Sequence, residues 1–91
     1  MSDVRDNPAE RRFELEVEGE LAILTYRRQD GALYLLHTEV PSELRGDGQG
    51  GRLVRHALDT ARAEGVRVVP LCPFVSAYLE KHPEYAELVE G

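Results

Sequence analysis

The sequence predicts an α/β (α+β) fold in which a mixed β-sheet is accompanied by helices, in the order βββαβα. Three runs of residues near the N-terminus alternate between apolar and polar side chains and are joined by short turn signals. A helical stripe follows, and a short apolar run then separates it from a second helical segment. Because a strand–helix–strand passage needs a parallel crossover, we expect a mixed sheet that is antiparallel at its start.

The three alternating runs predict an antiparallel meander. In RFELEVEG, the apolar residues Phe13, Leu15 and Val17 alternate with glutamates, as in a half-buried strand. Gly19-Glu20 and Asp30-Gly31 are tight-turn signals, and Asp-Gly tolerates the positive φ that hairpins need. The second and third strands are expected at Leu21–Arg28 and Ala32–Val40.

Two helices and one further strand follow Pro41. The first helix is expected to end at Gly65, a favourable C-cap residue. VRVVPLC is rich in β-branched residues and predicts a buried strand. PFVSAYLEKH begins with Pro73 at a favoured first-turn position and predicts the second helix, before an irregular or helical tail. The apolar stripe of the first helix consists of Leu53, Val54, Ala57, Leu58 and Ala61.

Composition limits the possible partners. The chain has 91 residues, a formal charge of −6 and one cysteine. This length suits a single domain, expected over residues 12–91 after a disordered tail at residues 1–11. The acidic balance argues against nucleic acid as a partner. One cysteine suits the reducing cytoplasm, and no membrane-spanning run or signal-peptide pattern is present, so we expect a cytoplasmic protein without a membrane partner.

Four glycines within the six residues Gly46–Gly51 precede the first helix. Free backbone N–H groups and the positive end of the helix converge at such a place, and glycines let the oxygens of a phosphate approach the amides. A plain glycine-rich turn is the alternative. The segment lacks the lysine and hydroxyl of a P-loop, and it follows antiparallel strands rather than the opening βα unit of a dinucleotide fold.

The spacing Arg45-x-x-Gly48-x-Gly50 at the start of a helix resembles the pyrophosphate motif of the GNAT superfamily of acyl-CoA-dependent N-acyltransferases. The segment from His37 to Tyr85 resembles a small group within it, the single-domain YjdJ-type predicted N-acetyltransferases. The resemblance implies a minimal GNAT-like fold that uses acetyl-CoA and no metal. It also implies a site for the pantetheine arm and the pyrophosphate of coenzyme A, formed by Val40, Arg45, Gly46, Asp47, Gly48, Gln49, Gly50, Gly51 and Arg52.

The candidate catalytic residues are His37, Glu39 and Cys72. By simple alternation His37 and Glu39 continue the face of Leu33 and Leu35, and a base with a pKa near the working pH would suit proton transfer. Cys72 ends the strand that follows the glycine loop, where it either accepts the acetyl group or lines the pocket.

Tyr78 and His82 are two further candidates for the chemistry. The tyrosine that often donates a proton in the superfamily falls one residue past Tyr78, on Leu79, so we interpret Tyr78 as a core residue. His82 is interpreted as a helix C-cap.

The resemblance therefore predicts an N-acetyltransferase that acetylates an amine of unknown identity, a small molecule or a protein. A CoA-binding or partner-binding module with little turnover is the alternative. It is favoured by the short connection between the first two strands, which leaves no room for the helices that build the acceptor pocket in the superfamily. The acceptor site is then expected to be shallow, open, or completed by another subunit of a homo-oligomer.

Overall fold

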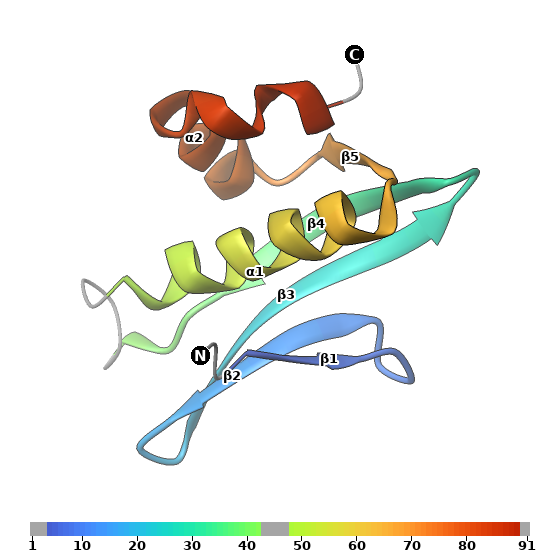
Figure 1. Cartoon of the computed structure of the whole chain (residues 1–91). Coiled ribbons are helices and arrows are strands. Elements are labelled where there is room, and N and C mark those ends of the chain that lie inside the picture. Colours follow the sequence, from blue (N-terminus) through green and yellow to red (C-terminus); the bar gives the residue numbers. More distant parts are fainter. Residues whose placement is uncertain (1–3, 43–47, 90–91) are drawn as a thin grey trace.

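A computed structural model of the chain describes residues 4–42 and 48–89 (Figure 1). Its sheet has five strands in the order β1-β2-β3-β4-β5. Both α-helices contact the sheet and each other, and the first lies across the strands in Figure 1. The elements are β1 (Arg5–Asn7), β2 (Arg12–Val17), β3 (Glu20–Gln29), β4 (Ala32–Glu39), α1 (Gln49–Glu64), β5 (Arg67–Pro70), α2 (Pro73–Lys81) and the 3-10 helix η2 (Pro83–Leu88).

The predicted meander and mixed sheet are confirmed. Strands β2, β3 and β4 pair antiparallel, whereas β4 and β5 pair parallel after the crossover through α1. Asp30 and Gly31 form the second turn with φ of 53° and 74°. The first turn is centred on Glu18 and Gly19, one residue earlier than predicted, because these two residues take the left-handed conformation that twisted hairpins require.

One hydrophobic core lies between the sheet and the helices. Phe13 and Leu15 of β2 and Leu24 of β3 are completely buried beneath α1, as the alternation predicts. The predicted apolar stripe of α1 forms the other wall of this core. Gly65 closes α1 in the left-handed conformation with its N–H bonded to the Arg62 carbonyl, so the predicted C-cap is confirmed.

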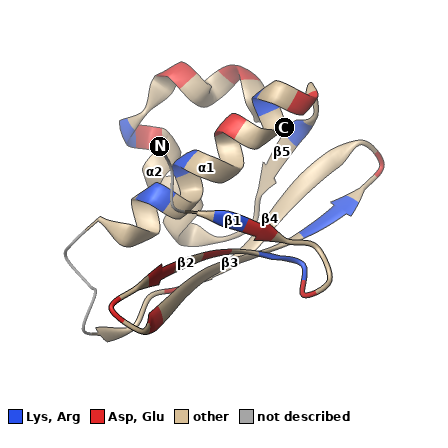
Figure 2. Cartoon of the chain, turned by 60° about the horizontal axis from the view of Figure 1, so that its bottom comes forward, with Lys and Arg blue, Asp and Glu red and all other residues tan. Residues whose placement is uncertain are grey.

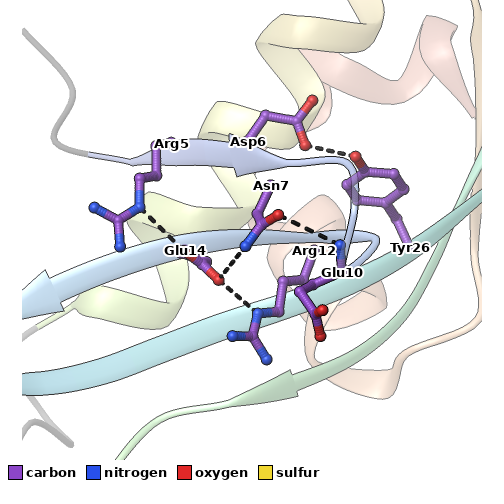
Figure 3. Close-up of polar contacts among 7 residues, drawn as sticks. All are labelled: Arg5, Asp6, Asn7, Glu10, Arg12, Glu14 and Tyr26. Carbon is purple, nitrogen blue, oxygen red and sulfur yellow. Dashed lines mark hydrogen bonds and ion pairs between the residues drawn. The ribbon is translucent and has the colours of Figure 1, made fainter.

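The first strand of the sheet lies in the segment for which the sequence predicts a disordered tail. Arg5–Asn7 pair antiparallel with β2, and Val4 is buried in the core, so the predicted disorder is wrong for these residues. The Tyr26 hydroxyl donates a 2.5 Å hydrogen bond to Asp6, which adds a second anchor (Figure 3). Among residues 4–11 only Val4 is buried in the core, so the segment shows no apolar alternation.

Glu14 is the polar centre that joins β1 to β2. Its carboxylate accepts hydrogen bonds from Arg5 at 3.0 Å, from Asn7 at 3.0 Å and from Arg12 at 2.6 Å (Figure 3). The residue is buried although it lies on the face opposite the helices. The hydrogen bonds from Arg12, then Asn7, outweigh the effect of burial and lower the pKa of Glu14 to about 2.

A β-bulge in β4 changes which side chains face the core. Thr25 pairs with His37, but the next residue, Tyr26, pairs with Leu35, so Leu36 is the extra residue. Beyond the bulge, Thr38 pairs with the buried Leu24 and lies on the helix side. The bulge therefore exchanges the faces that simple alternation assigns to the end of β4.

Candidate functional site

Strands β4 and β5 separate after a few paired residues, and the candidate site lies where they part. Their register ends at Leu35 and Pro70. The N–H groups of Leu71 and Cys72 then both donate to the Leu35 carbonyl, at 3.0 and 3.1 Å. Strand β4 continues to Glu39, whereas the segment that follows β5 turns into α2. Because β4 and β5 are parallel, both strands run toward the same edge of the sheet, and this point is the carboxyl end of β5.

Cys72 lies at this point as the N-cap residue of α2 and is 4% exposed. Its sulfur is 3.5 Å from the Thr38 hydroxyl of β4. Burial alone would raise the pKa of the thiol. Hydrogen bonds from Thr38 and from the backbone N–H groups of Val75 and Phe74 stabilise the thiolate instead, and the net result is a lowered pKa.

The N-terminus of α1 follows β4 at the same edge. Gly48 is its N-cap in the left-handed conformation, with φ of 76°, and no side chain of the described residues caps the helix. The first turn has no acidic residue, and Arg52 donates its backbone N–H to the Gly48 carbonyl. Gln49 is buried, and its side-chain oxygen accepts a 2.9 Å hydrogen bond from the Arg52 guanidinium. Such an end attracts an anion.

The predicted site is only partly described. Gly48, Gln49, Gly50, Gly51 and Arg52 all lie in the first turns of α1 or at its cap, and Val40 follows β4. Arg45, Gly46 and Asp47 lie outside the described residues.

Gly50 has a packing role that the sequence did not reveal. A Cβ atom at this position would lie 2.7 Å from Cζ of Phe74, which is closer than real side chains come. At Gly51 the nearest contact would be an ordinary 3.5 Å, to Tyr78. Gly50 therefore lets the first turn of α1 pack against the first turn of α2. Phe74 itself is 45% exposed beside it.

His37 and Glu39 do not join Cys72. The bulge at Leu36 puts them on the face of the sheet opposite the helices, and the expectation that they continue the face of Leu33 and Leu35 is wrong. Their side chains are 63% and 64% exposed, with 3.9 Å between Nε2 and Oε1. They line an open hollow of about 480 Å³ on that face. A ligand could contact both Cys72 and His37 only at the edge of β4, where β5 no longer pairs with it.

Tyr78 and His82 stack on each other with ring centroids 4.0 Å apart. Tyr78 is half-buried against the core, and burial raises the pKa of its hydroxyl. His82 occupies the C-cap position of α2, as predicted, and its backbone N–H donates to the Leu79 carbonyl. These contacts do not bring Tyr78 or His82 to the candidate catalytic residues.

The sequence missed two contributors to this region. Thr38 contacts the sulfur because of the bulge, which leaves no mark in the apolar pattern. Phe74 could have been suspected from the small residue opposite it, but only the fold brings the two helix starts together.

Two negative findings concern the described part of the chain. No helix in residues 4–42 or 48–89 is long and apolar enough to cross a membrane. Within the same ranges, no group of His, Cys, Asp and Glu side chains could hold a metal ion.

Comparison with known proteins supplies the remaining evidence on the fold. The model of the GCN5-related N-acetyl-transferase family matches residues 12–88. The structure is also similar to the NMR solution structure of a GCN5-like candidate N-acetyltransferase from Staphylococcus aureus, with a TM-score of 0.75 and 29% sequence identity. That alignment covers 100% of this chain and 92% of the other. The likeness confirms the predicted fold class.

Proposed function

Because the chain belongs to the GCN5-related N-acetyltransferase family, we propose that it binds acetyl-CoA and transfers the acetyl group to an amine. The observation that carries this proposal is the start of α1, where a left-handed Gly48 precedes a turn that has no acidic residue and, among residues 4–42 and 48–89, no capping side chain. This helix end lies at the same edge of the sheet as the separation of β4 and β5. Ligands of open α/β sheets bind at such an edge.

The pyrophosphate of coenzyme A would bind at the amides of the first turn of α1. The N–H groups of Gln49, Gly50 and Gly51 precede the first intrahelical hydrogen bond, which Arg52 makes. The helix dipole favours an anion there. Arg52 would add positive charge, and we include Arg45, Gly46 and Asp47 in the proposed site on the motif alone.

The pantetheine arm would lie along β4 beyond Leu35, where β5 no longer pairs with it. The backbone near Val40 would contact this arm. Thus the thioester would approach the edge residues of β4, between the helix face that holds Thr38 and Cys72 and the opposite face that holds His37.

Direct transfer has a balanced set of steps. The amine nitrogen attacks the thioester carbon, the new C–N bond forms and the C–S bond breaks. His37 would take the proton that the amine loses, and Glu39 would stabilise the imidazolium. The departing thiolate of coenzyme A takes up a proton from the solvent or from an acid beside it. The backbone amides would stabilise charge on the carbonyl oxygen.

Cys72 offers a second route for the acetyl group. In this route its sulfur attacks the thioester, an acetyl–Cys72 bond forms, the C–S bond to coenzyme A breaks, and the thiol proton ends on coenzyme A. The lowered pKa of Cys72 favours such an attack. Its burial favours the other role, in which it only lines the pocket.

One observation favours the alternative function, a CoA-binding module with little turnover. Both α-helices pack against the same side of the sheet, and within the described residues no helix covers the face that bears His37 and Glu39. An acceptor in the open hollow on that face would therefore have none of these helices over it.

The two functions are separated by a transfer assay. Acetyl-CoA is mixed with the protein and with amines or peptides, and both free coenzyme A and acetylated product are measured, with intact protein mass followed in parallel. Product formation that falls in His37→Gln, with CoA affinity kept, supports the transferase. CoA binding without product in any mixture supports the module. Absence of CoA binding contradicts both.

A further inference from the structure

Strand β3 extends beyond its neighbour β2 at one end of the sheet. Strand β2 begins at Arg12, which pairs with Thr25, whereas β3 continues to Gln29. On the other side, these last residues of β3 pair with the first residues of β4. The proposed coenzyme A site begins beyond Leu35, toward the opposite end of β4. The extension of β3 therefore lies away from that site.

A hollow of about 400 Å³ lies beside this extension. Its lining residues come from the turn before β2 and from β3, and they are Pro8, Arg11, Tyr26, Arg27 and Arg28. The Arg11 carbonyl accepts the Tyr26 N–H at 2.9 Å, which fixes the turn against β3. Because side chains alternate along a strand, Arg27 and Arg28 lie on opposite faces of the sheet and flank its edge. A hollow of this size suits a small molecule.

The lining of this hollow is basic. Three of its five residues are arginines and none is acidic. The Arg28 guanidinium donates to the Glu64 carboxylate at 2.6 and 3.1 Å, so its charge is balanced within the chain. In contrast, Arg11 and Arg27 form no ion pair with any residue in 4–42 or 48–89. Two exposed guanidinium groups are therefore open to an anion.

The other charges near the hollow do not occupy these two guanidinium groups. Arg12, next to Arg11 in the chain, is bound to the buried Glu14. Three acidic residues lie on β1 or on the turns before β2 and after β3 (Figure 2), and none of them lines the hollow: Asp6, Glu10 and Asp30. They lower the positive potential around the hollow but leave the donors of Arg11 and Arg27 unoccupied.

Arg28 adds a backbone donor to the hollow. The Tyr26 N–H is directed away from β4, toward the Arg11 carbonyl. Because N–H groups alternate in direction along a strand, the Arg28 N–H is directed to the same side, past the start of β2. Among the described residues, no backbone carbonyl of the preceding turn accepts it. The edge of β3 thus presents an unpaired donor between two arginines.

We propose that this hollow binds the phosphate group of a small phosphate monoester. Guanidinium groups match phosphate oxygens in charge and in hydrogen-bond geometry. Arg11 and Arg27 would donate to the phosphate from two sides, and the Arg28 N–H would donate to a third oxygen. The organic part of the ester would lie against Pro8. This second ligand site does not depend on the proposed acetyl transfer.

The arrangement of donors favours a phosphate over a carboxylate. A carboxylate is satisfied by the two parallel donors of a single guanidinium, whereas these donors come from a turn, a side chain of β3 and the edge of β3. The size of the hollow favours an ester over the bare ion. A nucleic acid would need a broader basic surface, which the neighbouring Asp6, Glu10 and Asp30 oppose.

Binding is tested by NMR titration of the labelled full chain without coenzyme A, with phenyl phosphate as the probe. We expect saturable shifts at the amides of Arg11, Arg27 and Arg28. Inorganic phosphate, which lacks the organic group, should shift the same amides with an affinity about threefold weaker. Phenol, which lacks the phosphate, should not shift them.

Two variants and one control test the contacts. Arg11→Gln and Arg27→Gln should each weaken phenyl phosphate by about fivefold or more, because each removes a charged donor. Arg67→Gln makes the same charge change at an exposed position of β5 that does not line the hollow, so the affinity should stay unchanged. All three side chains are exposed, so the variants are expected to fold, and dispersed spectra verify this.

The proposal is overturned if phenyl phosphate produces no saturable shift at Arg27 and Arg28, or shifts only the start of α1. It is also overturned if inorganic phosphate binds as tightly, or if Arg67→Gln weakens binding as much as Arg27→Gln does. Coenzyme A binding is followed separately at Gln49, Gly50 and Gly51. The two proposed sites can therefore fail independently of each other.

Discussion

The hydroxyl of Thr38 lies 3.5 Å from the sulfur of Cys72 and so connects β4 to the start of α2, where β4 and β5 have separated. The bulge at Leu36 is what turns Thr38 toward the helices. The contact therefore links the backbone irregularity of β4 directly to the state of the one thiol in the chain.

Removal of this contact is expected to make Cys72 less acidic. Thr38→Val deletes the hydroxyl that stabilises the thiolate, while the N–H groups of Phe74 and Val75 remain. The rate of alkylation by iodoacetamide, measured against pH, should then show its midpoint at a higher pH than in the unchanged protein.

Thr25→Val is the matched control, because that hydroxyl bonds to the His37 carbonyl on the opposite side of the sheet. Its midpoint should not move. Saturating coenzyme A should slow alkylation of Cys72 in the unchanged protein and in both variants if the thiol lies beside the bound thioester. Equal midpoints in all three proteins would show that Thr38 does not tune the thiol.

The Glu14 cluster is expected to stabilise the fold above mildly acidic pH. The pKa of Glu14 is about 2 in the folded chain against 4.5 in the unfolded chain, so its contribution is complete above pH 4.5 and is lost as the pH falls toward 2. We expect Glu14→Gln to lower the free energy of unfolding at pH 7 by about 1–2 kcal/mol, allowing for solvent around the exposed Arg5.

Urea unfolding at several pH values measures this effect. The difference between Glu14→Gln and the unchanged chain should shrink below pH 4.5 and nearly vanish near pH 2. Glu16→Gln, two residues along the same face and exposed, should change the free energy little at any pH. A difference for Glu14→Gln that stays constant with pH would show that its charge is not the cause.

Gly50 and Phe74 are expected to be coupled in stability. Gly50→Ala places a methyl group 2.7 Å from Cζ of the ring, so the half-exposed ring must move aside, and we expect this cost to cancel the gain of about 1 kcal/mol that alanine has over glycine in a helix. Phe74→Ala removes the collision, and the double variant should lose less than the sum of the two single variants.

Gly51→Ala is the control for this pair, because its methyl group meets only an ordinary 3.5 Å contact with Tyr78. It should be neutral or slightly stabilising, as alanine favours helix over glycine. Thermal unfolding measures all four variants. Strict additivity of Gly50→Ala and Phe74→Ala would contradict the close packing of the two helix starts.

The elements of the fold with strong local signals could be predicted from the sequence. The alternation around Phe13, the Asp30-Gly31 turn and the apolar stripe that ends at Gly65 each have a local physical cause, and each appears in the structure. Strand β1 could not be predicted in this way, because its order depends on side-chain contacts with Glu14 and Tyr26, which are distant in the sequence.

The candidate site was predictable in its residue types more than in its geometry. The glycines before α1 indicated a phosphate site from local helix physics alone. The face occupied by His37 depends on one extra residue in β4, and alternation assigned it incorrectly. Gly50 was interpreted through a ligand only, whereas the ring of Phe74 also requires it to be small.

The most direct test of the central claim is an NMR titration of the labelled protein with coenzyme A, followed at the amides of Gln49, Gly50 and Gly51. These N–H groups should shift strongly and saturably with coenzyme A, whereas pantetheine, which lacks the pyrophosphate, should move them little. Gly65, at the far end of α1, serves as the internal reference. Absence of any saturable shift at the three amides, with the spectrum otherwise that of a folded chain, would contradict the proposed coenzyme A site.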